Sequence, residues 1–166
     1  MSDFSKTAHD IKHRKIPKDD FTTPERLVQR CISVVNLIPY DVVLDAAYGC
    51  GVFFDNYPEY VIKYYCDKDS DFLFYPLFVD WIITNPPYSN LDKWMLKSCS
   101  ICRKGFAYLL GINNLTPKRI ELANDCGFGL ISLHLCKVFK WFGMSCFVVF
   151  ERGKPNIITY DRMVWK

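Results

Sequence analysis

Long hydrophobic runs are absent from this chain of 166 residues. None approaches the roughly 20 apolar residues that a membrane-spanning helix needs. The first 20 residues alternate charges and lack the apolar stretch of a secretory signal. These absences predict no membrane partner and a protein that is not secreted, located in the cytoplasm, the nucleus or the cytoplasm of a viral host. Half of the residues are hydrophobic and 16% are aromatic, which is enough for a packed core.

Histidine is scarce, and the cysteines are scattered. The three histidines are His9, His13 and His134, and Cys99 and Cys102 are the only close pair among eight cysteines. No second pair stands at the spacing of a zinc site. We therefore predict no metal site, and reduced, mostly buried thiols as expected in the cytoplasm or the nucleus. His134 alternates within an expected strand and is interpreted as structural.

Acidic residues are absent from positions 93–119, where the basic residues are Lys93, Lys97, Arg103, Lys104, Lys118 and Arg119. Positions 41–80 show the reverse balance, with two lysines against Asp41, Asp45, Asp55, Glu59, Asp67, Asp69, Asp71 and Asp80. This division is compatible with a cationic or hydroxyl-rich cofactor in the first half and a polyanion at the second. Solvated faces without a ligand are an equally simple interpretation of the basic block.

The stretch 81–89 is the most informative part of the chain. Trp81 to Thr84 form an apolar, β-branched run typical of a buried strand, and Asn85-Pro86-Pro87-Tyr88 follows at once. The two prolines end the strand and keep Asn85 out of the helical region. A polar amide and an aromatic ring are thus expected at the carboxyl end of a strand, where α/β sheets bind ligands.

These residues suit methyl transfer to a poor amine nucleophile, whose lone pair is delocalised into an aromatic ring. The Asn85 side-chain oxygen and the Pro86 carbonyl can both accept hydrogen bonds from an amino group, which frees the nitrogen lone pair. The Tyr88 ring can stack on a flat base. Taken alone, the motif is equally compatible with a strand followed by a proline turn.

A second strand, 42–44, opens into Asp45 and the loop Ala46–Gly51. Small residues and glycines allow a ligand to approach the backbone closely. A third strand, 61–66, precedes Asp67, which is 18 residues after Gly49 and is placed to bind ribose hydroxyls. Asp71 and Phe72 can hold an adenine ring by an amino contact and by stacking. A tight strand-to-helix turn without a ligand is the alternative for the loop.

The remaining elements follow from helix signals and apolar runs. A helix is expected to start at Thr23-Pro24, with Thr23 as cap, and to end near 37–39. It should bury Leu27, Val28, Cys31, Ile32 and Val35. Further helices are predicted over 91–100 and from Pro117, capped by Thr116 and ended before Gly127. Strands are predicted over 106–110, 129–135 and 146–150, the last two as antiparallel neighbours.

Four motifs in this order resemble those of the class I methyltransferases that use S-adenosylmethionine, specifically the amino-methyltransferases of adenine in DNA or RNA. Phe21–Pro24 resembles the segment beside the methionine end of the cofactor, and Asp45-x-x-x-Gly49-x-Gly51 resembles the cofactor loop. Asp67 is similar to the ribose-binding acid, Asp71-Phe72 to the adenine-contacting pair, and Asn85–Tyr88 to the catalytic motif. The motifs cover residues 21–89, with core structure expected to about residue 151.

The resemblance implies a Rossmann-like α/β fold with a mostly parallel central sheet and an antiparallel final strand pair. This fold would form one domain over 21–166, behind a flexible arm over 1–20. It implies S-adenosylmethionine as the cofactor, bound by Thr23, Pro24, Asp45, Ala46, Gly49, Gly51, Asp67, Asp71, Phe72 and Asn85.

The implied reaction is methyl transfer to the N6 amino group of adenine, in DNA rather than RNA. The implied catalytic residues are Asn85, Pro86, Pro87 and Tyr88, and the substrate-binding residues are Tyr88, Phe139, Trp141, Lys93 and Lys97. An adenine inside a duplex is out of reach, so the base must be flipped out or already single-stranded.

Three features depart from the family. Ala46 follows Asp45 where the family often has proline, and only about a dozen residues separate Asp67 from the strand at Trp81, as in compact phage-type members. No separate target-recognition domain is expected, which suggests a homodimer or a partner subunit that supplies recognition. The alternatives are adenine in RNA, a protein glutamine amide, cytosine (whose enzymes more often have Ser in place of Asn85), or a non-catalytic partner subunit.

Overall fold

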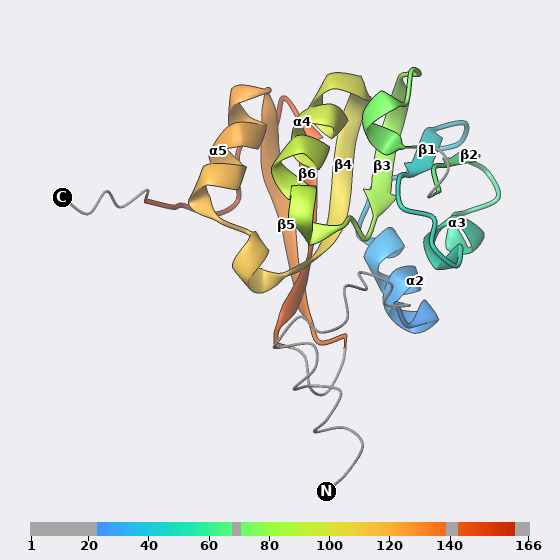
Figure 1. Ribbon diagram of the computed structural model, residues 1–166, viewed down its shortest axis with the longest axis horizontal. Coiled ribbons are helices and arrows are strands. Elements are labelled where there is room, and N and C mark those ends of the chain that lie inside the picture. The colour runs from blue at the N-terminus through green and yellow to red at the C-terminus, as the bar shows by residue number, and fades with distance from the viewer. Residues whose placement is uncertain (1–22, 68–70, 139–142, 162–166) are drawn as a thin grey trace, which may run out of the picture.

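Six strands form one sheet in the computed structural model, which describes residues 23–67, 71–138 and 143–161 (Figure 1). The order across the sheet is β2-β1-β3-β4-β6-β5. The strands are β1 (Val42–Asp45), β2 (Ile62–Tyr65), β3 (Val79–Thr84), β4 (Cys102–Gly111), β5 (Phe128–Cys136) and β6 (Ser145–Arg152). β2, β1, β3 and β4 run parallel, whereas β6 lies antiparallel between β4 and β5. This topology confirms the predicted α/β fold class and its antiparallel final pair.

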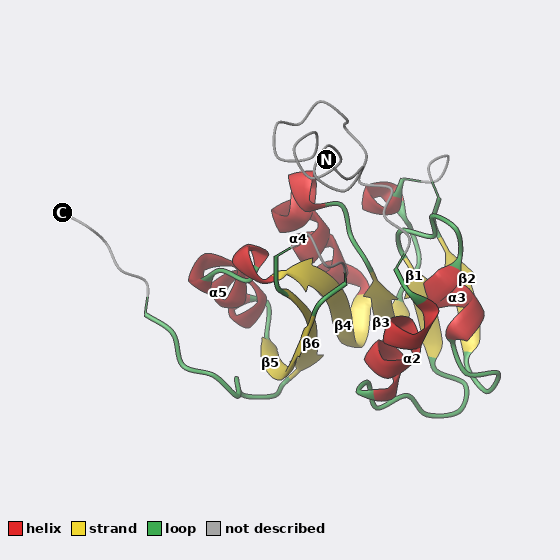
Figure 2. Cartoon of the chain, turned by 90° about the horizontal axis from the view of Figure 1, so that it is seen from below, coloured by secondary structure: helices red, strands yellow, loops and turns green. Residues whose placement is uncertain are grey.

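Helices cover both faces of the sheet. Figure 2 shows α4 and α5 on one side and α2 and α3 on the other. Their bounds are α2 (Glu25–Ser33), α3 (Val52–Asn56), α4 (Leu91–Ile101) and α5 (Pro117–Asp125), with single 3-10 turns η1 (Phe72–Phe74), η2 (Tyr88–Asn90) and η3 (Ile112–Asn114). Within the described ranges, no helix has both the length and the apolar character needed to cross a membrane.

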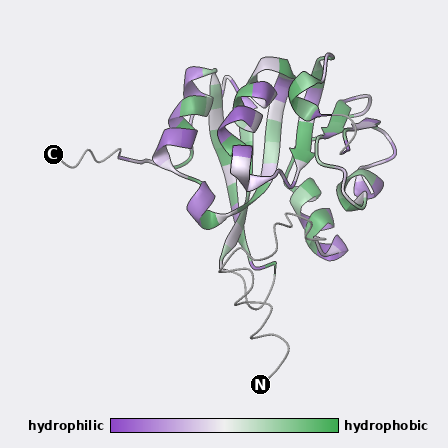
Figure 3. Ribbon diagram, in the orientation of Figure 1, coloured by the Kyte–Doolittle hydropathy of each residue, from purple (hydrophilic) through white to green (hydrophobic). Residues whose placement is uncertain are grey.

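Alternation along the strands divides the core into two layers. Leu44, Ile82 and Phe106 point to the face covered by α4 and α5, and their neighbours Val43 and Trp81 point to the face covered by α2 and α3. Figure 3 accordingly shows the strands mostly in the hydrophobic colour and the helices with hydrophilic stretches. Full burial of each such side chain contributes about 1.5–3 kcal/mol, so the central strands are held firmly in register.

The start and end of α5 agree with the sequence prediction. The Thr116 hydroxyl accepts a hydrogen bond from the Arg119 N–H at 3.4 Å, and Pro117 is the first helical residue. Gly127, just beyond the helix, has a φ of 84°, a left-handed conformation that glycine adopts without strain. The prediction of a helix over 91–100 is also confirmed, by α4.

The start of α2 differs from the prediction. Pro24, with φ −58° and ψ 131°, is the N-cap, and no side chain caps the helix. The Pro24 carbonyl accepts the N–H groups of Leu27 and Val28 at 2.9 and 3.1 Å, so Thr23 lies one residue too early to cap. The helix also ends at Ser33, before the predicted 37–39, in a tighter turn in which the N–H groups of Val34 and Val35 donate to carbonyls three residues back. Thr22 lies outside the described residues.

β2 is an edge strand of the sheet. It spans four residues, most of them exposed, and pairs only with β1 among the described strands. The described part of the linker to β3 contains the single turn η1, so it holds no further strand or full helix. This matches the expectation from the short spacing between Asp67 and Trp81.

All eight cysteines are thiols. Five of them are buried, as predicted, whereas Cys50 between the two loop glycines is exposed.

Candidate active site at the carboxyl edge of the sheet

Thr84 joins the carboxyl ends of β1 and β3. The two strands are adjacent and parallel, so Asp45 at the end of β1 lies beside the last residue of β3. The Thr84 hydroxyl donates to Asp45 Oδ1 at 2.7 Å and accepts the Ala47 N–H at 3.2 Å. The Ala47 N–H also lies 3.2 Å from Asp45 Oδ1. The glycine loop and the strand that leads into Asn85 are therefore bonded directly to each other.

Asp45 is fully buried, and its second carboxylate oxygen has no hydrogen-bond partner among the described residues. Burial raises the pKa of Asp45 to about 6, although the Thr84 hydroxyl and the backbone N–H groups of Ala47 and Phe54 stabilise the ionised form and limit the rise. A buried polar atom without a partner is costly and rare in folded proteins. Asp45 is thus well placed to accept a hydrogen bond from a cationic ligand at the loop.

The loop after Asp45 has the backbone of a ligand cradle. Gly49 and Gly51 have φ of 55° and 83°, values that side-chain-bearing residues rarely adopt. A Cβ on Gly51 would lie 2.7 Å from the Tyr48 hydroxyl, so a side chain there would displace the Tyr48 ring. The Gly51 N–H donates to the Tyr48 carbonyl at 2.7 Å, which closes the turn.

Aromatic side chains line the loop and the end of β2. The rings of Tyr48 and Tyr65 are 4.3 Å apart, and Phe54 of α3 meets Tyr65 edge-on at 5.3 Å. Tyr48 is the one large side chain in a loop of otherwise small residues, and no role was predicted for it from the sequence. Its signal was the unexpected tyrosine between Ala47 and Gly49.

Asp67 lies near this loop, and Asp71 and Phe72, the pair predicted to contact adenine, lie at the start of η1. The Cys66 N–H donates to the Asp45 carbonyl at 2.8 Å, which brings the exposed Asp67 beside the loop. Asp71 accepts the Leu73 N–H at 2.9 Å and so caps η1. Phe72 is only 2% exposed and packs 4.6 Å from the Trp94 ring of α4. The Phe72 ring stabilises the core, and its position gives no support to stacking on an adenine.

Asn85-Pro86-Pro87-Tyr88 leaves the sheet as predicted. β3 ends at Thr84, Pro87 is extended with φ −65° and ψ 131°, and Tyr88 begins η2. Asn85 is half-buried and its amide makes no hydrogen bond to another described side chain or backbone group. Tyr88 is half-buried and packs against the core on the α4 side. The amide and the ring are therefore held on a rigid backbone at the same edge as Asp45.

Tyr57 binds the end of β3 and was not predicted from the sequence. Its hydroxyl donates to the Ile83 carbonyl, two residues before Asn85, and the side chain is only 3% exposed. Burial raises the pKa of Tyr57 well above its ordinary range, with a smaller effect of Asp45, so the hydroxyl remains a donor. No local pattern marks Tyr57, because its partner is 26 residues away.

No protein-family model and no curated protein matches the chain. The magnesium protoporphyrin IX methyltransferase of Synechocystis PCC 6803, with bound SAM, superimposes with a TM-score of 0.63 over 92% of this chain and 85% of that chain, at 12% identity. TrmN from Thermus thermophilus superimposes with a TM-score of 0.58 over 81% of this chain and 50% of that chain, at 19% identity. The M protein of the type I restriction enzyme EcoKI superimposes with a TM-score of 0.59 over 81% of this chain and 44% of that chain, at 13% identity. The chain has a methyltransferase fold.

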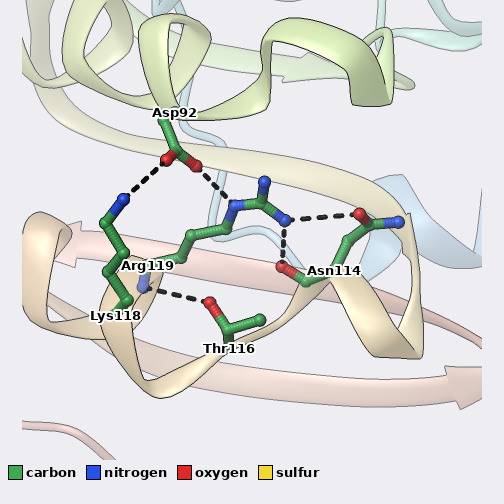
Figure 4. Close-up of polar contacts among 5 residues, drawn as sticks. All are labelled: Asp92, Asn114, Thr116, Lys118 and Arg119. Atoms are coloured by element: carbon green, nitrogen blue, oxygen red, sulfur yellow. Dashed lines mark hydrogen bonds and ion pairs between the residues drawn. The ribbon is translucent and has the colours of Figure 1, made fainter.

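In this methyltransferase fold, Asp92 lies on the side of the Asn85 loop away from Asp45. It is in the first turn of α4, four residues after Tyr88, and is bonded to the start of α5 (Figure 4). Arg119 Nε donates to Asp92 Oδ1 at 2.6 Å, and Lys118 Nζ lies 3.3 Å from Asp92 Oδ2. Arg119 also donates to the carbonyl and the side-chain oxygen of Asn114 at 2.8 and 3.3 Å. These bonds join the loops that follow β3 and β4.

Most basic residues of the block 93–119 thus make contacts with other residues of this chain. Lys97 Nζ donates to the Tyr75 carbonyl at 2.8 Å, and Lys104 pairs with the buried Asp41. The Arg103 guanidinium lies 5.9 Å from the Phe78 ring centre. Lys93 is exposed and has no ion pair with another described residue. A phosphate contact of Lys93 or Lys97 remains a prediction.

Two predicted site segments have no further test. Thr23 is buried and Pro24 exposed at the start of α2, and α2 is tied to α3 by the bond from Gln29 Nε2 to Asn56 Oδ1 at 3.0 Å. Thr23, two residues before α2, therefore leads into the helix that packs beside α3, which follows the glycine loop. Phe139 and Trp141 lie outside the described residues.

Proposed function

We propose that this protein transfers a methyl group from S-adenosylmethionine to the N6 amino group of adenine in DNA. The observation that carries the proposal is the direct bond between the two motif loops. Thr84 holds Asp45 on one side and is followed at once by Asn85 on the other. A cofactor cradle and an amine-binding loop thus share one edge of the sheet.

The residues present fit S-adenosylmethionine. Its amino group and sulfonium are cationic, and the unpartnered oxygen of the buried Asp45 offers a negative acceptor. The positive-φ glycines let the backbone approach the ligand closely, and the carboxylate of Asp67 can accept hydrogen bonds from ribose hydroxyls. The Synechocystis structure of the same fold contains bound SAM. When bound, S-adenosylmethionine supplies an electrophilic methyl group.

Asn85 and Pro86 prepare the acceptor. The Asn85 side-chain oxygen and the Pro86 carbonyl each accept one N–H of the exocyclic amine, so the nitrogen lone pair is free for the new bond. The proton that the nitrogen then loses goes to solvent. Asn85 has no competing bond to a described residue, and the two prolines fix the positions of both acceptors. Tyr88 stacks on the base.

DNA adenine is favoured by the first residue of the motif. Asparagine in this position resembles the adenine enzymes, and the EcoKI M protein, a restriction-enzyme component, has the same fold. The fold alone does not select a substrate, since a porphyrin methyltransferase shares it. The half-buried Tyr88 offers one face to a base that has left the helix stack.

The test is methyl transfer from labelled S-adenosylmethionine to separate pools of duplex DNA, single-stranded DNA, structured RNA and protein. The label should appear in DNA and should be recovered as N6-methyladenine after digestion to nucleosides. Label in RNA or in protein glutamine would replace DNA adenine by that substrate. Bound cofactor without transfer to any pool would contradict an enzyme that acts alone. Absence of cofactor binding would overturn the proposal.

A further inference from the structure

A second surface lies at the amino ends of the parallel strands, at the opposite end of the sheet from the candidate active site. Six large apolar side chains are exposed where the chain enters β1, β2 and β3, and we call them the amino-edge patch: Ile38, Tyr40, Tyr60, Ile62, Leu77 and Phe78. Tyr40 is 80% exposed and Phe78 62%. Aromatic residues gathered on a surface are typical of protein interfaces, whereas single exposed apolar residues are ordinary.

Hydrogen bonds connect the segments that carry this patch across neighbouring strands. The Tyr40 N–H donates to the Tyr60 carbonyl at 2.8 Å, which places the two residues side by side. The Val42 N–H donates to Asp80 Oδ2 at 2.9 Å, and this bond joins the start of β1 to the start of β3. The aromatic row therefore runs Tyr60, Tyr40, Phe78, in the order of β2, β1 and β3.

The centre of the row is a preformed turn. Tyr40 has a φ of 68°, in the left-handed region that residues with a side chain rarely adopt. The turn is held by the Asp41 N–H on the Ile38 carbonyl and by the Ile38 N–H on Asp41 Oδ2, both at 3.2 Å. Lys104 in turn pairs with Asp41. Tyr40 is thus presented by a fixed backbone, which lowers the entropic cost of binding.

The two ends of the row carry opposite charges. Glu59 is exposed beside Tyr60, and Arg103 is exposed and lies against the Phe78 ring, 5.9 Å from its centre. In a pair related by a two-fold axis, the same patch meets itself in reverse direction. A two-fold axis near Tyr40 would therefore bring each Glu59 to the other copy's Arg103. A partner with charge of one sign would match only one end of the row.

We propose that the amino-edge patch is the surface through which two copies of this chain associate, with reciprocal Glu59–Arg103 pairs around a central Tyr40 contact. The three aromatic side chains of the row offer on the order of 400 Å², about half of what one partner buries in a standard interface. The dimer should accordingly be reversible. The catalytic edge lies at the other ends of the parallel strands, so both active sites remain open. The proposal does not depend on the reaction proposed above.

Sedimentation equilibrium of the full chain over a wide range of concentration tests the proposal. The mass should rise from 19.4 kDa towards twice that value. R103E and E59R should each weaken association by at least about tenfold, because each places like charges together. The double variant E59R/R103E should restore it, since both pairs then have opposite charges again. Tyr40→Ala should also weaken association by about tenfold or more.

The matched control is K154E, which makes the same charge change at an exposed lysine of the β6 end. It should leave association unchanged, and circular dichroism should show that every variant is folded. A wild-type chain that stays monomeric at all concentrations overturns the proposal. Association that R103E and E59R leave intact, or that the double variant fails to restore, overturns this surface as the interface.

Discussion

Two aspartates on either side of the Asn85 loop differ in how their carboxylates are satisfied. Asp45 is fully buried, and one of its oxygens has no partner among the described residues. Asp92 is 40% exposed, and both of its oxygens are bonded, to Arg119 and to Lys118. The pKa of Asp45 is raised by burial, whereas the pKa of Asp92 is lowered by its hydrogen bond to Arg119.

This difference separates a binding group from a structural one. A buried carboxylate with an open acceptor position destabilises the folded chain until a ligand fills that position. A carboxylate with two cationic partners has both oxygens bonded already, and it instead holds the neighbouring loops in place. We infer that the Asp45 side of the edge is prepared for a cofactor, and that the Asp92 side is a brace which holds the substrate side in shape.

The largest expected effect lies between the two aspartates. Asn85→Ala removes one of the two acceptors of the amine and should lower kcat by about 10²–10³, the usual effect of losing one preorganised hydrogen-bonding group. Cofactor affinity, measured by calorimetry, should stay close to wild type. Asn36→Ala, at an exposed asparagine beyond α2, is the control. A near-normal rate for Asn85→Ala would show that the catalytic assignment is wrong.

Stability as a function of pH should distinguish the two aspartates directly. The folded-state pKa of Asp45 is about 6, above the ordinary 3.8, so the folded chain holds this proton more tightly than the unfolded chain. Stability should therefore fall by about 3 kcal/mol as pH rises from about 4 to about 6. The lowered pKa of Asp92 acts the other way, because its contribution is lost only as pH falls below the ordinary value.

Urea denaturation at about pH 4, 5, 6 and 7 measures this slope. Asp45→Asn should flatten the slope between about pH 4 and 6, since it removes the group that titrates there. Asp92→Asn should leave that window unchanged. Equal slopes for Asp45→Asn and wild type would contradict the assigned burial of a titrating Asp45.

Local signals were sufficient to predict most of the scaffold. β1, β3 and β4 are apolar runs long enough to be buried on both faces, and the Asn-Pro-Pro sequence marks the end of β3 without outside help. Thr116 and Gly127 mark the start and the end of α5, because capping residues act on the backbone next to them. The register of motif loops at one edge then follows from the parallel topology.

The remaining features depend on partners far apart in the sequence. Thr84 and Asp45 are 39 residues apart, and Lys104 and Asp41 are 63 apart, so no spacing rule connects them. The basic block suggested a polyanion because its partners Asp92 and Asp41 lie outside it. Phe72 illustrates the same limit, since an aromatic residue beside an acid serves a ligand or a core equally well until Trp94 is placed against it.

Asp45→Asn should lower cofactor affinity by about 10–100-fold, because a charge-assisted hydrogen bond contributes about 1.5–3 kcal/mol. The unliganded variant should be as stable as wild type or more stable near pH 7, since a buried charge is removed. Calorimetric titration with S-adenosylmethionine and thermal unfolding give the two numbers. A variant that binds normally would remove Asp45 from the cofactor site.

The brace around Asp92 should give the smallest effect and the opposite pattern. Arg119→Ala breaks the bonds to Asp92 and Asn114 and should lower the free energy of unfolding by about 1 kcal/mol, a value reduced by the partial exposure of Asp92. Lys118→Ala, at a lysine that is 64% exposed, is the matched control and should change stability by less than about 0.5 kcal/mol. Cofactor affinity should be unaffected in both variants, because the brace lies across the Asn85 loop from the glycine loop. If Arg119→Ala weakened cofactor binding as much as Asp45→Asn does, the two sides of the edge would be one coupled unit, and the separation of binding group from brace would fail.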